Sequence, residues 1–160
     1  MSSALKTTYV GDREPRLRPA ALWVTLAVIG ILAVAMGVSF IVLRPNIVLR
    51  AEDQRFTGLD PDQLKALIAQ LFVWIGLVFR SWGAFAIGLG ILVTAVGSTA
   101  YRQGDRWAWW ALVAAGLLTF GIFLAVNVVL ASDFKYPIAL LLAAYLWGAL
   151  AQAPHLNGVR

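Results

Sequence analysis

Residues 79–110 read FRSWGAFAIGLGILVTAVGSTAYRQGDRWAWW, and this stretch decides the fold class. It holds an arginine at the edge of an apolar run, regularly spaced glycines within that run, a short charged loop and a cluster of tryptophans. Such a pattern is typical of a helix that crosses a bilayer, turns tightly and returns through an aromatic belt. The stretch therefore predicts two antiparallel transmembrane helices, at about 81–100 and 107–131.

The composition also favours a membrane protein. The 160 residues are 61% apolar and 13% charged, whereas soluble domains have about 45 to 50% and about 25%. The formal charge of +5 comes from basic residues spread over the tail and loops, so flanking charge on a membrane protein explains it better than nucleic-acid binding does. The chain has no cysteine, which excludes disulfides, thiolate metal sites and a cysteine nucleophile.

A first transmembrane helix is predicted at about 20–43. Only Thr25 and Ser39 interrupt its apolar run, which exceeds the roughly 20 residues that a span requires. A cleaved signal peptide is the alternative, because a basic stretch precedes the run and residues 33–35 (AVA) resemble a cleavage site. The apolar run continues past that site to Leu43, and signal peptides have shorter apolar regions.

The segment before residue 81 needs its own explanation. Residues 44–60 carry mixed charges that nearly cancel, so we expect an interfacial loop, with a small cap over a ligand as the alternative. Asp60 and Pro61 are a good helix start. A helix from there to residue 100 would be about 60 Å long, twice the hydrocarbon thickness. Residues 61–79 are therefore predicted to form an amphipathic interfacial helix, with a bend between Gly76 and Gly83.

The rest of the chain completes an all-α bundle of four transmembrane helices, in a domain at 19–154. After a turn at 132–135, a short fourth span is predicted at about 137–153. Residues 1–18 are predicted to be a flexible basic tail, and residues 155–160 a brief C-terminal tail. With the N-terminus inside, seven basic residues lie inside and six outside. Because the first helix usually dominates orientation, the basic tail favours cytoplasmic termini in a bacterial inner cell membrane.

Glycines recur every seven residues in two of the predicted spans. Gly83, Gly90 and Gly97 lie in the second span, and Gly30 and Gly37 repeat the interval in the first. Small residues let helices approach closely in lipid, and this spacing predicts left-handed packing with crossings of about 20°. A ligand slot in the space left by the missing side chains is the alternative.

Few residues suit catalysis or metal binding. The only histidine, His155, lies beyond the last span, and no carboxylate lies within any predicted span. Metal binding, haem ligation and paired-acid chemistry therefore have no candidates. We expect no catalytic residue, no metal and no cofactor. The spans also lack the polar faces that would line a channel.

Arg80 is the exception, because it is predicted at the outer end of the second span and at the depth of Asn127. One interpretation is an interfacial anchor whose side chain snorkels to the surface. The other is an outward-facing pocket for an anionic head group or a quinone carbonyl. In that pocket Asn127 would accept a hydrogen bond from Arg80, and Asp133 or Asp53 would supply the counter-charge. Further lining would come from Trp82, Trp74 and Gln70.

Three segments, RSWG at 80–83, GLG at 88–90 and YRQGDRWAW at 101–109, resemble the DoxX-like group of small bacterial four-helix membrane proteins. The likeness covers about residues 78–115. It implies a four-helix bundle. The DoxX family proper is linked to a quinone-reducing thiosulfate oxidoreductase, but no catalytic residue of that family is matched here.

Together these patterns predict a non-enzymatic integral membrane protein. We expect an accessory or scaffold subunit that packs against another membrane protein or against itself, surrounded by membrane lipids and without nucleic acid. The alternative is a lipid- or quinone-binding protein that uses the pocket around Arg80, as part of an oxidoreductase.

Overall fold

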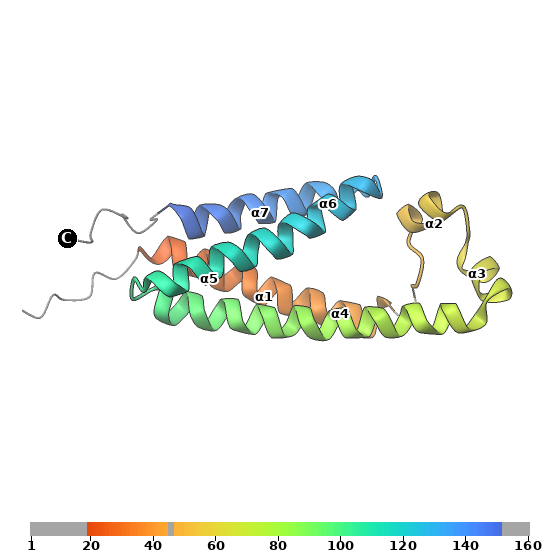
Figure 1. Ribbon diagram of the computed structural model, residues 1–160, viewed down its shortest axis with the longest axis horizontal. Helices are drawn as coiled ribbons and strands as arrows, with labels where there is room; N and C mark the ends of the chain where they lie inside the picture. Colours follow the sequence, from red (N-terminus) through yellow and green to blue (C-terminus); the bar gives the residue numbers. More distant parts are fainter. Residues whose placement is uncertain (1–18, 45–46, 152–160) are drawn as a thin grey trace, which may run out of the picture.

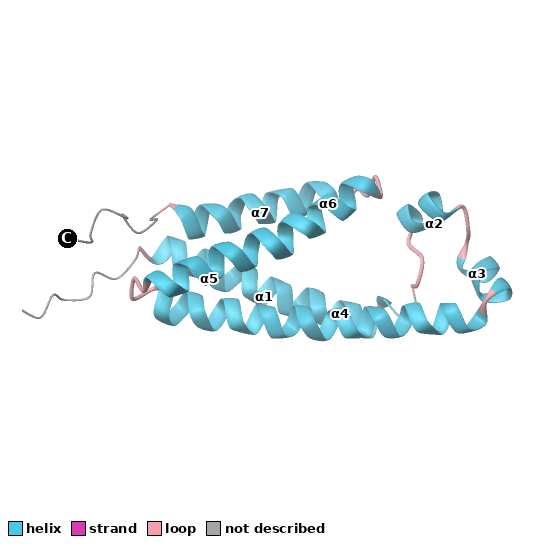
Figure 2. Ribbon diagram, in the orientation of Figure 1, coloured by secondary structure: helices cyan, strands magenta, loops and turns pink. Residues whose placement is uncertain are grey.

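The computed structural model describes residues 19–44 and 47–151, and every regular element in these ranges is helical (Figures 1 and 2). The predicted all-α class is confirmed for this part of the chain. Three helices are long and apolar enough to cross a membrane, at Ala20–Val42, Ala69–Tyr101 and Arg106–Val129. The last helix, α7 (Lys135–Leu150), has 16 residues and is shorter. The two predicted tails, His155 and the end of the predicted fourth span lie outside the described ranges.

The helices form two groups that meet at one end. Helix α1 (Ala20–Val42) packs along α4 (Ala69–Val96), and α7 packs against both α1 and α5 (Arg106–Gly116). A π-helical turn, η3 (Leu117–Gly121), joins α5 to α6 (Ile122–Val129). Figure 1 shows the groups close together where α1 begins and α7 ends, and apart where the chain connects α1 to α4. We refer to these as the terminal end and the connector end.

Glycines bring the backbones of α1 and α4 together. A Cβ atom built on Gly37 would lie 2.5 Å from the carbonyl oxygen of Gly83, and one built on Gly83 would lie 2.5 Å from that of Gly37. Gly30 and Gly90 face each other in the same way. The predicted packing role is confirmed for these four residues. Gly97 is less crowded, since the nearest atom to its built Cβ is Leu26 Cβ at 3.4 Å.

Hydrogen bonds to backbone carbonyls hold α7 at the terminal end. Tyr101, at the end of the π-helical turn η2 (Gly97–Tyr101), donates from its hydroxyl to Gly148 O at 2.5 Å. Trp109 Nε1 donates to Ala149 O at 2.7 Å, and the Tyr145 hydroxyl donates to Leu112 O at 2.8 Å. Because the donors are buried, these bonds replace the water that their polar atoms have lost.

The connector and the start of the second long helix differ from prediction. The expected loop at 44–60 contains a short helix, α2 (Ala51–Thr57), and the helix expected at 61–79 is divided. Helix α3 (Pro61–Leu67) ends at Ile68, whose φ of −145° and ψ of 81° are not helical, and α4 then runs unbroken through Gly76 and Gly83. The break in the chain therefore lies at Ile68, before the region in which a bend was expected.

Burial explains the position of the break. Asp60 Oδ1 accepts from Gln63 N at 2.7 Å and starts α3, which then lies over the first turns of α4. Leu64 of α3 is buried together with Val48 and Leu49 of the connector, and Phe72 of α4 packs against them. A straight helix from residue 61 could not bring Leu64 back onto α4. The connector is thus a folded element with a small apolar core of its own.

Candidate functional site

An apolar groove opens between the α1–α4 pair and the η3–α6 segment. Its volume is about 490 Å³, which lies in the size range of small-molecule sites. All the described residues that line it are uncharged, and five are aromatic. We call it the connector-end groove, and its lining consists of Met36, Phe40, Trp82, Phe85, Ala86, Leu89, Leu118, Thr119, Phe120, Ile122, Phe123 and Val126.

The groove exists because the two helix groups are packed tightly against each other only at the terminal end. There the ring of Tyr145 lies against Gly116, and Gly148 lies close to Leu22 and Leu26. On the η3–α6 segment the situation differs, since a Cβ atom built on Gly121 would meet no atom within 4 Å. Helix α6 packs against α7 but makes no comparable contact with α1 or α4, and the side chains between them leave space open.

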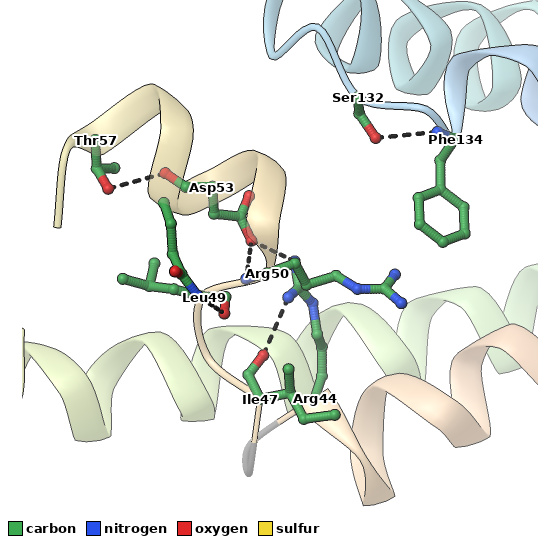
Figure 3. Close-up of polar contacts among 9 residues, drawn as sticks. Arg44, Ile47, Leu49, Arg50, Asp53, Thr57, Ser132 and Phe134 are labelled. Atoms are coloured by element: carbon green, nitrogen blue, oxygen red, sulfur yellow. Dashed lines mark hydrogen bonds and ion pairs between the residues drawn. The ribbon is translucent and has the colours of Figure 1, made fainter. Parts of the chain in front are cut away.

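A cluster of polar and aromatic contacts fixes the connector to the adjacent end of the α1–α4 pair. Arg44 donates from Nη2 to Asp53 Oδ2 at 3.0 Å and from Nη1 to Ile47 O at 3.0 Å (Figure 3). Its Cζ lies 4.3 Å from the ring centroid of Phe79, which stacks on Phe40 with centroids 6.0 Å apart. We call Arg44, Asp53 and Phe79 the connector clasp. Phe40 also lines the groove, so the clasp is continuous with it.

Arg50 extends from the connector to the turn between α6 and α7. Its backbone N–H donates to Asp53 Oδ2 at 2.9 Å, while its guanidinium lies over the ring of Phe134, with Cζ 4.4 Å from the ring centroid. Figure 3 shows this side chain reaching from the connector towards Phe134. Within the described ranges, the guanidinium has no carboxylate or carbonyl acceptor. The Arg50 side chain thus links the connector to the α6–α7 turn, in these ranges through its contact with the Phe134 ring.

A residue with positive φ and two hydrogen bonds fix the turn that holds Phe134. Ala131 has a φ of +50°, and Ser132 N donates to Asn127 O at 3.0 Å, as in a helix C-terminal motif that normally favours glycine. Ser132 is buried, and its Oγ accepts from Phe134 N at 3.1 Å. The ring beneath Arg50 is therefore positioned by hydrogen bonds to buried atoms.

The residues predicted around Arg80 lie in different surroundings. Trp82 lines the connector-end groove, but Arg80, Trp74 and Gln70 are exposed on α4 and do not line it. Arg80 and Trp82 are two residues apart, which places them on nearly opposite sides of a helix. Asn127 is buried, and its Nδ2 donates to Phe123 O of its own helix at 2.9 Å.

The predicted partners of Arg80 are engaged elsewhere or remain apart from it. Asp53, one of the two expected counter-charges, is paired with Arg44. Across residues 19–44 and 47–151, no hydrogen bond or ion pair joins Arg80 to Asn127 or to Asp133. The structure therefore brings Trp82 to the groove and leaves Arg80 on another face of α4.

Arg44 and Arg50 were expected only as loop charges that nearly cancel. Two spacings could have drawn attention to them. Arg44 follows Phe40 by four residues, one helical turn, and Asp53 follows Arg50 by three, the spacing of a side chain that caps a helix start. The contacts with Phe79 and Phe134 depend on tertiary structure and leave no sequence signal.

In the part of the chain that the structure describes, the fold is all-helical and includes three helices suited to crossing a membrane. Comparisons with protein-family models, with curated proteins and with solved structures found no match to this chain. The function is therefore inferred from the groove and from the residues at its connector end.

Proposed function

We propose that the chain is a non-enzymatic, multi-pass membrane protein that binds the acyl chain of a membrane lipid in the connector-end groove. The observation that carries this proposal is an uncharged groove of about 490 Å³, with five aromatic residues among the twelve that line it, on a molecule whose helices suit a bilayer. Lipid surrounds such a protein at high concentration, so even a weak preference for the groove would keep it occupied.

The dimensions of the groove favour a lipid chain over a partner's helix. On α4 the lining extends from Trp82 to Leu89, about 10 Å at the rise of an α-helix. A partner's helix about 10 Å in diameter would therefore contact this wall over only about two turns. An extended hydrocarbon chain is much thinner than a helix, so it can lie within the space that the side chains leave.

Filling the groove is expected to displace the lipid. In Ala86→Phe the new ring would occupy the groove, so the amount of lipid retained per protein should fall by about tenfold, equivalent to about 1.4 kcal/mol of lost packing. Native mass spectrometry after purification in mild detergent measures the retained lipid. Ala84→Phe is the matched control, because Ala84 is exposed on the same helix and does not line the groove.

Equal retention of lipid by Ala86→Phe and Ala84→Phe would contradict lipid binding in the groove.

The same measurement tests a second candidate function, an accessory or scaffold subunit. That candidate is favoured by the exposure of Trp82 (54%) and Phe85 (78%), because aromatic side chains of this kind also suit a protein partner. A stoichiometric membrane protein in the place of the lipid would support it. A monomer that carries lipid and no partner would contradict it.

Our proposal places the protein in a cell membrane with α7 as a fourth crossing helix and both termini in the cytoplasm. This places the connector end outside. Engineered cysteines at Thr57 and Gln103, both exposed, test the arrangement without interference, since the chain has no native cysteine. An impermeant thiol reagent added to intact cells should label the Thr57 variant, and should label the Gln103 variant only after lysis. Labelling of the Gln103 variant in intact cells would overturn the orientation.

A further inference from the structure

We infer that the lipid in the connector-end groove carries an anionic head group, and that the guanidinium of Arg50 binds it. This inference rests on the proposed function, because it assigns the head group of the lipid whose chain fills the groove. It commits to an amphiphile with a phosphate or carboxylate group next to its acyl chain.

The charges at the connector end support an anion. Arg44 is neutralised by Asp53 at 3.0 Å, and its side chain is largely buried, with 16% exposed. Arg50 shares the same carboxylate only through its backbone N–H, so its positive charge is not balanced by Asp53. Asp133 is exposed beside Phe134 in the sequence and forms no ion pair with Arg50 in the described ranges. Within the described ranges, the guanidinium of Arg50 therefore has no ion-pair partner, and it lies between the connector and the α6–α7 turn.

The contact with Phe134 prepares Arg50 for such a ligand. A guanidinium over an aromatic ring uses one of its faces, while its five N–H groups point outward in its own plane. Planar donors in a fixed fork match the oxygens of a phosphate or carboxylate. The ring holds the side chain in place, at 4.4 Å, without consuming a donor. Less side-chain freedom is then lost when an anion binds.

Hydrogen bonds connect residues next to both walls of the groove with Arg50 and Phe134. On one wall Phe40 lines the groove, and one turn later Arg44 binds Asp53, whose Oδ2 also holds Arg50 N. On the other wall Val126 lines the groove, and the residue after it, Asn127, accepts from Ser132, which in turn holds Phe134. These bonds join the connector end of the groove to both residues of the Arg50–Phe134 contact, which is where we place the head group.

The test compares two arginines of the same connector. Arg50→Gln removes the charge at the groove, whereas Arg55→Gln removes an equal charge from the last turn of α2, where the side chain is exposed. Each protein is purified from mixed micelles with equal amounts of phosphatidylglycerol and phosphatidylcholine, and the retained lipids are quantified by native mass spectrometry. The wild type and Arg55→Gln should prefer phosphatidylglycerol. Arg50→Gln should lower that preference by about tenfold and leave the total retained lipid unchanged.

The outcomes separate the inference from the proposed function. If Arg50→Gln keeps the preference while Ala86→Phe lowers total lipid, the groove binds lipid but the head-group assignment is overturned. If Ala86→Phe retains as much lipid as the wild type, the proposed function itself fails. Phe134→Leu provides a second variant that keeps the charge and removes the ring, so a smaller fall in preference is expected. An unchanged preference in both Arg50→Gln and Phe134→Leu excludes Arg50 as the head-group ligand.

Discussion

Gly83→Ala is expected to force α1 away from α4 and to lower the free energy of unfolding by about 3 kcal/mol, the upper end of the usual range for overpacking. The added methyl carbon would lie 2.5 Å from Gly37 O and 2.6 Å from Ile41 Cγ1. A side chain can rotate away from such a contact, but a backbone carbonyl within a helix cannot move without its neighbours. The two helices must therefore separate along their whole contact.

Gly88→Ala is the matched control for this prediction. Gly88 lies five residues further along α4, and a Cβ atom built on it meets nothing within 4 Å. The substitution should raise stability by up to about 1 kcal/mol, since alanine is the better helix former. Unfolding of both variants by denaturant in micelles can be followed through the fluorescence of the seven tryptophans. Equal stabilities for the two variants would show that the glycines do not set the helix separation.

The sequence predicted the features that depend on one helix at a time. The first span was expected at 20–43 and α1 covers Ala20–Val42, because the length of an apolar run is a local property. The packing role of the glycines was equally predictable, since a seven-residue spacing places Gly83 and Gly90 on the same side of a helix whatever the partner is. These features required no knowledge of how the helices meet.

Features that depend on two or more elements were missed. The break at Ile68 has no glycine or proline to mark it, and follows from the burial of Leu64 on α4. The groove depends on the divergence of two helix groups, which no single segment encodes. Asn127 was predicted to meet Arg80, but its amide donates to Phe123 O one turn earlier. That carbonyl is within reach as soon as the helix forms, so a long-range partner has to compete with it.

Tyr145→Ala is expected to have the largest effect on stability, a loss of about 3 to 5 kcal/mol. The side chain is fully buried, donates to Leu112 O at 2.8 Å, and its ring centroid lies 5.4 Å from that of Phe120. Removing it opens a cavity between α7, α5 and η3 and leaves no hydrogen bond from this position to α5.

Tyr136→Ala is the control on the same helix. Because Tyr136 is 70% exposed, the control should change stability by no more than about 0.5 kcal/mol.

A substitution at Gly116, which lies against Tyr145, tests whether the loss of stability comes from the packing of the Tyr145 ring. A methyl group on Gly116 would overlap that ring, so Gly116→Ala should be destabilising in the wild type. In Tyr145→Ala the ring is gone, and the same methyl group would enter the vacated space and recover part of the packing. The double variant should therefore be more stable than additivity predicts, with a coupling of about 1 to 3 kcal/mol. Strictly additive losses in denaturant unfolding would mean that the two residues do not touch, and would contradict the packing of α7 on α5 from which the groove derives its shape.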